Sequence, residues 1–505
     1  MKSTCLNILF LAAGANAQRV VQASIQHFES KELGPAVPLI KLGLGTPAQN
    51  ITGIFDTASS DIIVPEAAPF KPDAAADIQL LAGKSFNATL SRGEHFEGDY
   101  AKTTVTLDGV EVPDAQVGFA SNIQTQANIS DLAVVGVGLV AREATANKYN
   151  NLPRILNVSG VTNSQAYSVV FNATPLGNGS VFFGGIDRSK FTGDLQQVPL
   201  VKDKAGQFSE FLVELSSIAL VPAAAPAKVR RSTRQERREQ IRRIPVNNND
   251  GKKNELPNQE APTETRKQEA PKTTSKQAAP KETPKQEAPK LEVPKLEAPK
   301  TTSKLAAPKT TSTQAAPKTT SKQAAPKETP KQEAPKKEAP KKDNGGGQPA
   351  KLIASTDLGL DQRSAVTLMN TAGGAMALPA AVVAKMAGAL GTSFSATNGL
   401  GPVDCGRLGG DAALLMRFRN DTVEARVPLS NLRVSAELAD PAIAQRGLCE
   451  VAVRPVPDGG AEPNVATLPF FAAMYTVFDL GNRSLWFAQA RGDPSVSGAQ
   501  LEEFP

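Results

Sequence analysis

The stretch that decides the fold of this chain reads Phe55-Asp56-Thr57-Ala58-Ser59-Ser60-Asp61. Ile54 precedes it, and the apolar run Ile62-Ile63-Val64-Pro65 follows it. This pattern predicts a strand, a tight loop and a second strand. Backbone N–H groups and neighbouring hydroxyls can hold an aspartate in such a loop as an ionised acid. Asp56 is therefore a candidate for one half of a site formed by two carboxylates.

A second stretch, residues 366–379, has the same shape and is the natural place for the other half. It reads Val366-Thr367-Leu368-Met369-Asn370-Thr371-Ala372-Gly373-Gly374, followed by Ala375-Met376-Ala377-Leu378-Pro379. The position that matches Asp56 is Asn370. An amide does not take a proton from water as a carboxylate does, so this one difference governs the expected chemistry.

Length and charge limit the class of protein. The chain has 505 residues, enough for two or more domains, and a formal net charge of +6. Residues 228–343 contain 29 Lys+Arg and 15 Asp+Glu, which leaves 27 basic and 35 acidic residues elsewhere. The basic character therefore belongs to one segment. With no nucleic-acid motif present, we expect no nucleic-acid partner.

The N-terminus predicts secretion. Residues 1–17 resemble a signal peptide, with Lys2, the mostly apolar run Leu6–Ala13 and the small-residue cleavage site Ala15-Asn16-Ala17. We find no other membrane-segment candidate, and the polar tail 493–505 contains no lipid-anchor signal. We expect an extracellular or cell-wall protein without a transmembrane helix.

Cysteines and glycosylation sequons fit this destination. Cys5 leaves with the signal, and Cys405 with Cys449 is expected to form one disulfide in an oxidising compartment. Eight Asn-x-Ser/Thr sites are candidates for glycosylation. They begin at Asn50, Asn87, Asn128, Asn157, Asn172, Asn178, Asn420 and Asn482.

From residue 36 to about 200, short apolar runs alternate with turn residues, which predicts a β-rich domain. Asp108-Gly109 and Gly177-Asn178-Gly179 are hairpin-turn signals, and residues 150–156 are the one short helix start suggested here. Residues 18–35 are polar and leave two alternatives open, a short propeptide or an ordered N-terminal strand.

With these motifs in order, the chain resembles the pepsin family of aspartic peptidases, most of all its secreted and cell-surface fungal members. The resemblance covers nearly all of the chain except residues 222–350. The matching stretches are Leu44–Gln49, Asp56–Asp61, Asp131–Gly138, Gly179–Asp187, Phe191–Leu195, Phe211–Leu220, Asn370–Pro379, Leu468–Asn482 and Trp486–Ala490.

The resemblance implies an all-β, bilobal fold with a peptide-binding cleft between two lobes. The N-terminal lobe would span 36–205, and the C-terminal lobe 206–221 and 351–492. Each lobe of the family supplies one aspartate, and the two carboxylates share a proton and act together in acid. The family also implies loop support by Thr57, Ser59 and Thr371, a C-lobe disulfide at Cys405 and Cys449, a monomer, and neither cofactor nor metal.

Several positions depart from the family pattern. Asp56 matches the first catalytic aspartate and Asn370 the second. Ala58 and Ala372 replace the loop glycines, and each adds a Cβ where the family keeps close backbone contact. Gly373 replaces a hydroxylated residue beside the second acid.

The hairpin over the cleft, the flap, should carry a tyrosine, but the matching position falls near Leu90. His95 nearby is expected to be an exposed loop residue. Asp357 and Asp361 lie upstream of the second loop and outside the aligned motif.

Residues 222–350 differ in amino-acid composition from the rest of the chain. A basic run that includes Arg230-Arg231 is followed by Pro-Lys pairs mostly nine residues apart, with almost no large apolar residues. Such a segment cannot offset its ordering entropy, so we expect a disordered surface insert in the C-terminal lobe. It is either a low-complexity expansion without a role, an O-glycosylated spacer, a basic tether to an acidic cell-wall or surface polymer or to a membrane, or a processing site at Arg230-Arg231.

The sequence thus predicts a secreted pepsin-like endopeptidase homologue, catalytically impaired by its Asp56/Asn370 pair, that retains peptide binding in the cleft. One alternative is a working acid endopeptidase with an atypical site. The other is a surface interaction protein that acts through its basic insert.

Overall fold

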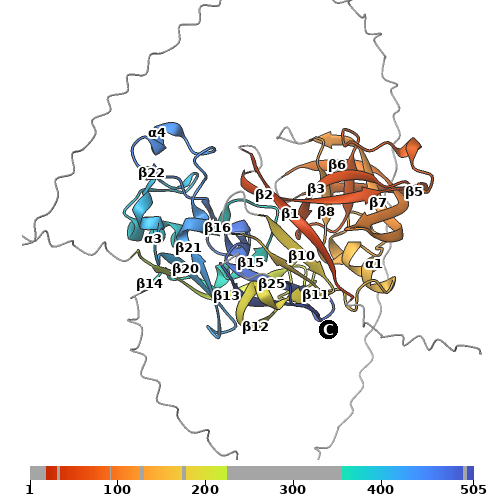
Figure 1. Ribbon diagram of the computed structural model, residues 1–505. Coiled ribbons are helices and arrows are strands. Elements are labelled where there is room, and N and C mark those ends of the chain that lie inside the picture. Colours follow the sequence, from red (N-terminus) through yellow and green to blue (C-terminus); the bar gives the residue numbers. More distant parts are fainter. Residues whose placement is uncertain are drawn as a thin grey trace, which may run out of the picture. The chain divides into compact units, whose positions relative to one another are not determined.

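The computed structural model describes residues 19–30, 34–90, 93–124, 130–172, 178–223, 355–492 and 498–505. Strands dominate these residues, which confirms the predicted all-β class (Figure 1). The predicted signal peptide, Asn128 and nearly all of the predicted insert, with Arg230-Arg231, lie outside the described residues.

The larger sheet has thirteen strands and runs through the whole N-terminal half. In spatial order its strands are β12 (Phe191–Pro199), β26 (Ser484–Ala490), β25 (Met474–Asp479), β9 (Tyr167–Val170), β10 (Gly179–Phe183), β1 (Val21–Ser30), β2 (Gly34–Leu44), β3 (Gln49–Asp56), β8 (Ala133–Gly136), β4 (Ile62–Pro65), β7 (Val110–Gln124), β6 (His95–Leu107) and β5 (Gln79–Thr89).

A second, eight-stranded sheet forms the C-terminal half. Its order is β21 (Val423–Pro428), β20 (Ala413–Phe418), β13 (Leu212–Val221), β15 (Val366–Met369), β24 (Asn464–Ala466), β16 (Met376–Pro379) and β23 (Val453–Val456), with β14 (Thr356–Asp357) beside β13. Three short pairs complete the strands: β11 (Gly185–Asp187) with β27 (Leu501–Glu503), β17 (Phe394–Ser395) with β18 (Gly399–Leu400), and β19 (Val403–Asp404) with β22 (Leu448–Cys449).

Helices are short in the described ranges. The α-helices are α1 (Leu152–Val158), α3 (Ala380–Leu390), α4 (Pro441–Ala444) and α5 (Leu468–Phe471). Helix α1 confirms the helix start predicted at residues 150–156. The 3-10 turns are Pro72–Ala74, Val140–Arg142, Arg188–Lys190, Gln362–Ser364, Cys405–Leu408 and Leu429–Leu432.

The two sheets repeat one local arrangement. Strands β3, β8, β4 and β7 lie in that order, and successive pairs are parallel, antiparallel and parallel. Strands β15, β24, β16 and β23 repeat the same order and the same directions. Asp56 is the last residue of β3, and Asn370 directly follows β15. The fold therefore places these two residues at equivalent points of the two halves.

Aromatic packing joins residues from distant parts of the chain. Tyr167 of β9 stacks on Phe478 of β25, with 5.0 Å between ring centroids, and Phe211 meets Phe478 at 4.8 Å. Phe55, directly before Asp56, packs edge-on against Tyr167 at 6.1 Å. All four side chains are fully buried. Aromatic pairs of this geometry add to the stabilisation from buried area, so the strand that ends at Asp56 is anchored in the central core.

Two segments differ from the prediction, and in a third the structure shows one of two predicted alternatives. Strands β25 and β26, predicted within the C-terminal lobe, pair with β9 and β12 of the N-terminal half, because their apolar faces complete that core. The predicted polar tail contains β27, and Phe504 beside it is buried against Trp486. Of the two alternatives for residues 18–35, the structure shows an ordered strand, β1, between β10 and β2.

Gly136 tests how tightly β8 supports the first loop. A Cβ at Gly136 would lie 2.6–2.7 Å from backbone atoms of Ser60 and Asp61. We predict that Gly136→Ala lowers the free energy of unfolding by about 1–3 kcal/mol through overpacking. Gly388 in α3 is the control, because its Cβ would meet nothing within 4 Å. Gly388→Ala should raise stability by up to about 1 kcal/mol. Urea midpoints compare both variants, and equal midpoints would contradict the close packing.

Candidate active site

The end of β3 and the loop that follows it hold Asp56 in a buried and well-supported position. Asp56 is 3% exposed, and the backbone N–H of Ala58 donates to its Oδ1 at 2.8 Å. Two residues that follow β8 also support the loop: Val137 N donates to the Asp56 carbonyl at 3.0 Å, and Gly138 N donates to the Ser59 carbonyl at 2.7 Å. The carboxylate therefore has a fixed orientation set by the backbone around it.

The loop after β15 holds Asn370 in the same way. Asn370 is 4% exposed, and Ala372 N donates to its Oδ1 at 2.8 Å. Its own N–H donates to the Ala466 carbonyl at 2.9 Å. Because Asn370 Oδ1 accepts the hydrogen bond from Ala372 N, the other branch of the Asn370 side chain is the NH₂ group, which only donates. The second half of the site thus has the shape of the first and a different chemistry.

Thr57 and Thr371 link the two loops by reciprocal hydrogen bonds. The Thr57 hydroxyl donates to the Met369 carbonyl at 2.8 Å, and the Thr371 hydroxyl donates to the Phe55 carbonyl at 2.8 Å. Each hydroxyl also accepts the backbone N–H of the other threonine, at 3.1 and 3.2 Å. Both residues are at most 1% exposed. The bonds hold the Asp56 and Asn370 loops beside one another.

The two alanines in the loops are accommodated by packing. Ala58 belongs to a buried cluster with Leu212 and Leu368, which lie in the C-terminal half. Ala372 belongs to a cluster with Val37 and Ile54, which lie in the N-terminal half. Each methyl group thus packs against the opposite half. The added Cβ atoms contribute apolar contact between the halves while both backbone N–H donors remain in place.

Gly373 lies where no side chain fits. A Cβ on Gly373 would lie 2.8 Å from Cγ2 of Thr467, which is itself buried. Within the described ranges, the Thr467 hydroxyl has no hydrogen-bond partner, and neither does the buried hydroxyl of Ser59 on the first loop. Thr467 therefore fills the space that a hydroxylated residue at position 373 would need.

The predicted flap is the hairpin of β5 and β6. Leu90 is at its turn, where Leu90 N donates to the Glu94 carbonyl at 2.8 Å and Gly93 N donates to the Leu90 carbonyl at 2.9 Å. Leu90 packs against a cluster that contains Ile63 and Phe86. His95 begins β6 and contacts Thr89 and Glu97, so the expectation of an exposed loop residue was wrong. The pairing of β5 with β6 places His95 opposite Thr89.

A buried polar network that the sequence motif did not reveal surrounds Asp61. Tyr100 and Tyr149 both donate to Asp61 Oδ1, at 2.6 and 2.7 Å, and Ala144 N donates to Oδ2 at 2.9 Å. Burial and the nearby Asp61 raise the pKa of both tyrosines. The partners are 39 to 88 residues from Asp61 in sequence, so no local signal could have identified them.

Glu143 is the second carboxyl group of this network and is 4% exposed. Tyr149 N donates to its Oε2 at 2.9 Å, while its Oε1 has no hydrogen-bond partner among the described residues. Burial, and then the charge of Asp61, raise the pKa of Glu143 from 4.5 to about 8. A carboxyl group held in this way is neutral in acid.

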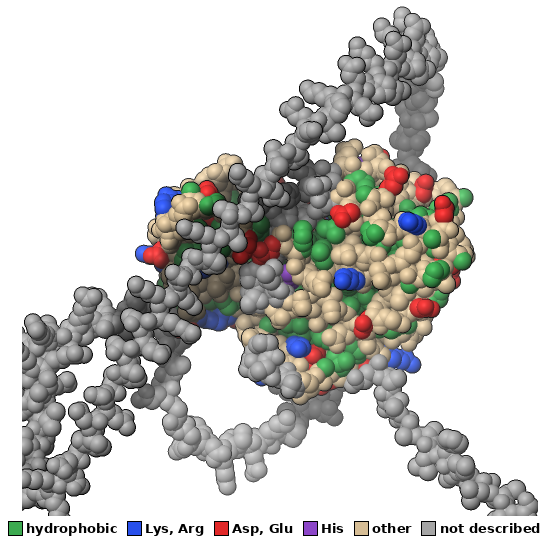
Figure 2. Space-filling model, turned by 45° about the horizontal axis from the view of Figure 1, so that its top comes forward, with side chains coloured by type: hydrophobic (Ala, Val, Ile, Leu, Met, Phe, Trp, Pro, Cys, Tyr) green, Lys and Arg blue, Asp and Glu red, His purple; other side chains and the backbone are tan. Residues whose placement is uncertain are grey.

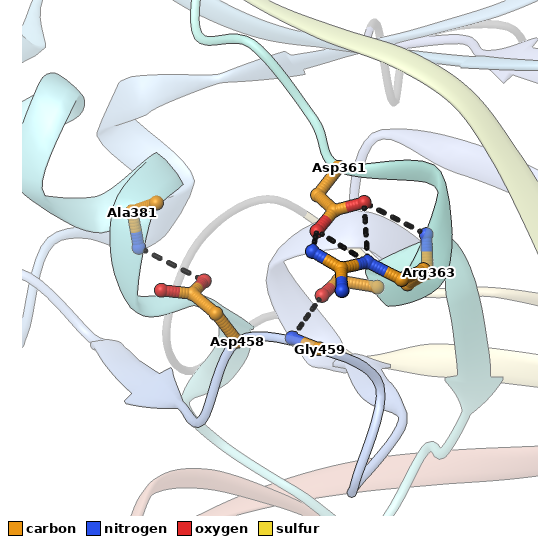
Figure 3. A network of polar contacts seen from close by, with 6 residues as sticks. Asp361, Arg363, Ala381, Asp458 and Gly459 are labelled. Atoms are coloured by element: carbon orange, nitrogen blue, oxygen red, sulfur yellow. Dashed lines mark hydrogen bonds and ion pairs between the residues drawn. The ribbon is translucent and has the colours of Figure 1, made fainter.

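The aspartates upstream of the second loop, Asp357 and Asp361, have hydrogen-bond partners close to them in sequence. Asp361 forms an ion pair with Arg363, with 2.7 Å between Oδ2 and a guanidinium nitrogen (Figure 3). In the same view Asp458 accepts Ala381 N at 3.1 Å, near the start of α3. Asp357, which precedes this network in the sequence, accepts a hydrogen bond from Gly359 N at 2.9 Å. These carboxylates have local structural partners.

The predicted disulfide is present, and most of the described glycosylation candidates are exposed. Cys405 and Cys449 form a disulfide. Asn50, Asn87, Asn172, Asn178, Asn420 and Asn482 are exposed, and Asn157 is half-buried. Glycosylation at these sites stays a prediction. Acidic and basic side chains are both spread over the face that Figure 2 shows.

No metal-binding cluster of His, Cys, Asp or Glu occurs in the described part of the chain. In the same residues, no helix has the length and apolar character needed to cross a membrane.

Two linked, equivalent loops at the junction of two β halves define the fold of pepsin-like aspartic proteinases. The crystal structure of an aspartic proteinase from Irpex lacteus shares this fold, with a TM-score of 0.54 and 13% sequence identity over 95% of this chain and 99% of that one. Residues 39–225 match the family model described as "Eukaryotic aspartyl protease".

Fungal proteins resemble this chain over part of their length. The "Probable aspartic-type endopeptidase OPSB" of Arthroderma benhamiae is 32% identical over 200 residues, which are 35% of this chain and 39% of that protein. Barrierpepsin of Saccharomyces cerevisiae is 30% identical over 202 residues, 32% and 34% of the two chains. "Secreted aspartic protease 8" of Candida albicans is 29% identical over 203 residues, 36% and 47% of the two chains.

The chain therefore spans less than half the length of these three relatives. Residues 39–225 are thus similar to eukaryotic aspartyl proteases, fungal ones among them, and the chain shares the fold of an aspartic proteinase.

The link between the loops can be tested at Thr371. We predict that Thr371→Val lowers the free energy of unfolding by about 2–4 kcal/mol, because Thr57 N and the Phe55 carbonyl lose their partners in a buried setting. Thr371→Ser retains the hydroxyl and should cost only about 1 kcal/mol for the lost methyl group. Urea unfolding measures both, and a serine variant as unstable as the valine variant would refute the hydrogen-bond explanation.

The raised pKa of Glu143 predicts that the free energy of unfolding depends on pH. With a folded pKa of about 8 and an ordinary value of 4.5, the native state holds a proton that the unfolded chain has lost between these pH values. Stability is therefore expected to fall as pH rises through this window, by on the order of a few kcal/mol in total.

Glu143→Gln should flatten this part of the pH profile of the urea midpoint. Glu111→Gln, at an exposed position near the start of β7, makes the same change of charge and should leave the slope intact. Equal slopes in wild type and Glu143→Gln would assign the pH dependence to other groups.

Proposed function

We propose that this protein is an extracellular pepsin-like aspartic peptidase homologue that binds peptides in its cleft and has impaired catalysis. The observation that carries the proposal is the pair of equivalent bonds, Ala58 N to Asp56 Oδ1 and Ala372 N to Asn370 Oδ1. The framework of a two-carboxylate site is complete, and one carboxylate is replaced by an amide.

The chemistry of the pair explains the expected impairment. In a two-aspartate site one carboxylate accepts a proton from water while the other, protonated, polarises the scissile carbonyl. Asn370 can neither accept nor share that proton. Loss of general acid–base catalysis typically lowers the rate by ~10²–10⁴, and by more where the two groups act as a unit.

Retained peptide binding is supported by the order of the site. The loops are joined by four buried hydrogen bonds between Thr57, Thr371 and the strands they follow. The flap hairpin is formed, with Leu90 at its turn. A cleft that is shaped by backbone and packing can bind an extended peptide without the second carboxylate.

Secretion and function in the extracellular space are proposed on two observations. Residues 1–17 have the pattern of a signal peptide. One of the fungal relatives is named a secreted aspartic protease.

The decisive measurement is peptide cleavage at about pH 3–5 by wild type, Asn370→Asp and Asp56→Ala. We expect little or no cleavage by wild type and a gain of at least ~10²-fold in Asn370→Asp. The double variant Asp56→Ala/Asn370→Asp is the control. It should not cleave peptides, because its site again has only one carboxylate.

Wild-type cleavage that disappears in Asp56→Ala would reject the impairment and establish an active peptidase with an atypical site. If Asn370→Asp folds normally but does not cleave peptides, the loss of activity would have further causes in the site, and Ala58, Ala372 and the flap would be implicated.

A further inference from the structure

A hollow lies beside Asn50 on an exposed face of the N-terminal sheet. It has a volume of about 290 Å³, and strands β1, β2, β3 and β6 contribute to its walls. Typical small-molecule sites have roughly 300–1,000 Å³. The hollow is at the lower end of this range, so it fits one compact group such as a single sugar ring.

The hollow exists because position 43 is a glycine. Gly43 of β2 pairs with Asn50 of β3 on one side and with Thr106 of β6 on the other. Directly paired residues of neighbouring strands project to the same face of a sheet, so Asn50 and Thr106 flank a residue without a side chain. A Cβ at Gly43 would lie 3.1 Å from the Cβ atoms of Ala48 and Thr106. Any larger residue at position 43 would therefore fill the space beside Asn50.

Asn50 is also the acceptor residue of a glycosylation sequon, Asn50-Ile51-Thr52. Its side chain is exposed and lines the hollow. Of the seven sequon asparagines in the described ranges, it is the one that lines this hollow.

Three other sequon asparagines have amide nitrogens that are already bonded within the fold. Asn87 Nδ2 donates to Glu97, Asn157 Nδ2 to the Thr162 carbonyl, and Asn482 Nδ2 to Asp479. A glycan on one of these nitrogens would replace a hydrogen of a group that serves the fold. Asn50 is better placed, because its side chain borders open space.

The walls of the hollow match the chemistry of an N-acetylated sugar. Gln26, Lys41 and Asp108 line it, and all three are exposed. Their side chains supply donors and acceptors for the hydroxyl and acetamido groups of a sugar. Leu39 and Ala48 add apolar surface for the acetyl methyl group and for the apolar face of the ring.

We propose that this hollow binds the first N-acetylglucosamine of an N-linked glycan on Asn50, which makes that sugar a fixed part of the N-terminal half. The inference rests on the secretion proposed above, because such glycans are added to secreted chains. In the transfer, Asn50 Nδ2 forms a bond to C1 of the sugar, and the bond from C1 to the diphosphate of a lipid-linked oligosaccharide breaks. The displaced amide proton leaves with the diphosphate. Folding then places the sugar beside Gly43.

The first measurement is occupancy. The full chain is produced in a eukaryotic host that adds N-linked glycans, and peptides of the exported protein are analysed by mass spectrometry. We expect a glycan on Asn50 in wild type and none at this position in Asn50→Gln. Exported protein with an unmodified Asn50 would overturn the inference and leave secretion intact. A chain that is not exported would reject the proposed secretion, and this inference with it.

The second measurement tests whether the sugar occupies the hollow. A glycosidase that cleaves the bond between sugar and amide is applied to the folded protein, and the rate at Asn50 is followed. Gly43→Ala adds a methyl group to the hollow and should speed removal roughly tenfold, because the sugar is no longer held. Gly388→Ala is the control and should retain the wild-type rate, since its Cβ meets nothing within 4 Å. Equal rates in Gly43→Ala and wild type would overturn the inference.

The third measurement does not depend on the folding of Gly43→Ala. An endoglycosidase trims the glycans of wild type to one sugar each, and a second sample is fully deglycosylated. A group that contacts only the native state stabilises it, so the one-sugar form should keep the urea midpoint of the intact glycoprotein and exceed that of the sugar-free form. In Asn50→Gln the one-sugar and sugar-free forms should have the same midpoint. Equal midpoints of these two forms in wild type would contradict a bound first sugar.

Discussion

The structure depends on the exchange of hydrogen bonds between Thr57 and Thr371. Their hydroxyls satisfy four backbone groups across the junction of the two halves, in a place from which water is excluded. Buried backbone groups without partners are costly, so neither loop can move alone without breaking bonds of the other. This constraint holds Asp56 and Asn370 on adjacent loops of equivalent shape.

Packing reinforces the same junction. Ala58 lies against Leu212 and Leu368, and Ala372 lies against Val37 and Ile54, so each loop inserts a methyl group into the opposite half. Thr467 occupies the space next to Gly373. The substitutions that depart from the family pattern are therefore compatible with an ordered site, and the change at Asn370 is one of chemistry and not of geometry.

The surroundings of the first loop contain a second group of acidic residues. Asp61 is satisfied by two tyrosine hydroxyls and a backbone N–H, and Glu143 is held in the neutral form by burial next to it. A pair of carboxyl groups in one buried region cannot both ionise cheaply. This explains why the Glu143 carboxyl group beside the first loop keeps its proton up to about pH 8.

The sequence by itself determined the β class, the two loops, the helix near residue 152 and the disulfide partners, because each rests on a local pattern or a single pair of residues. It also identified the amide at position 370, since residue identity needs no fold. The tertiary structure alone decided that β25 and β26 join the N-terminal sheet, that Phe504 is buried, and that the two alanines pack across the junction. It alone brought Glu143, Tyr100 and Tyr149 to Asp61. These contacts join residues far apart in sequence, and no local periodicity specifies which distant side chains meet.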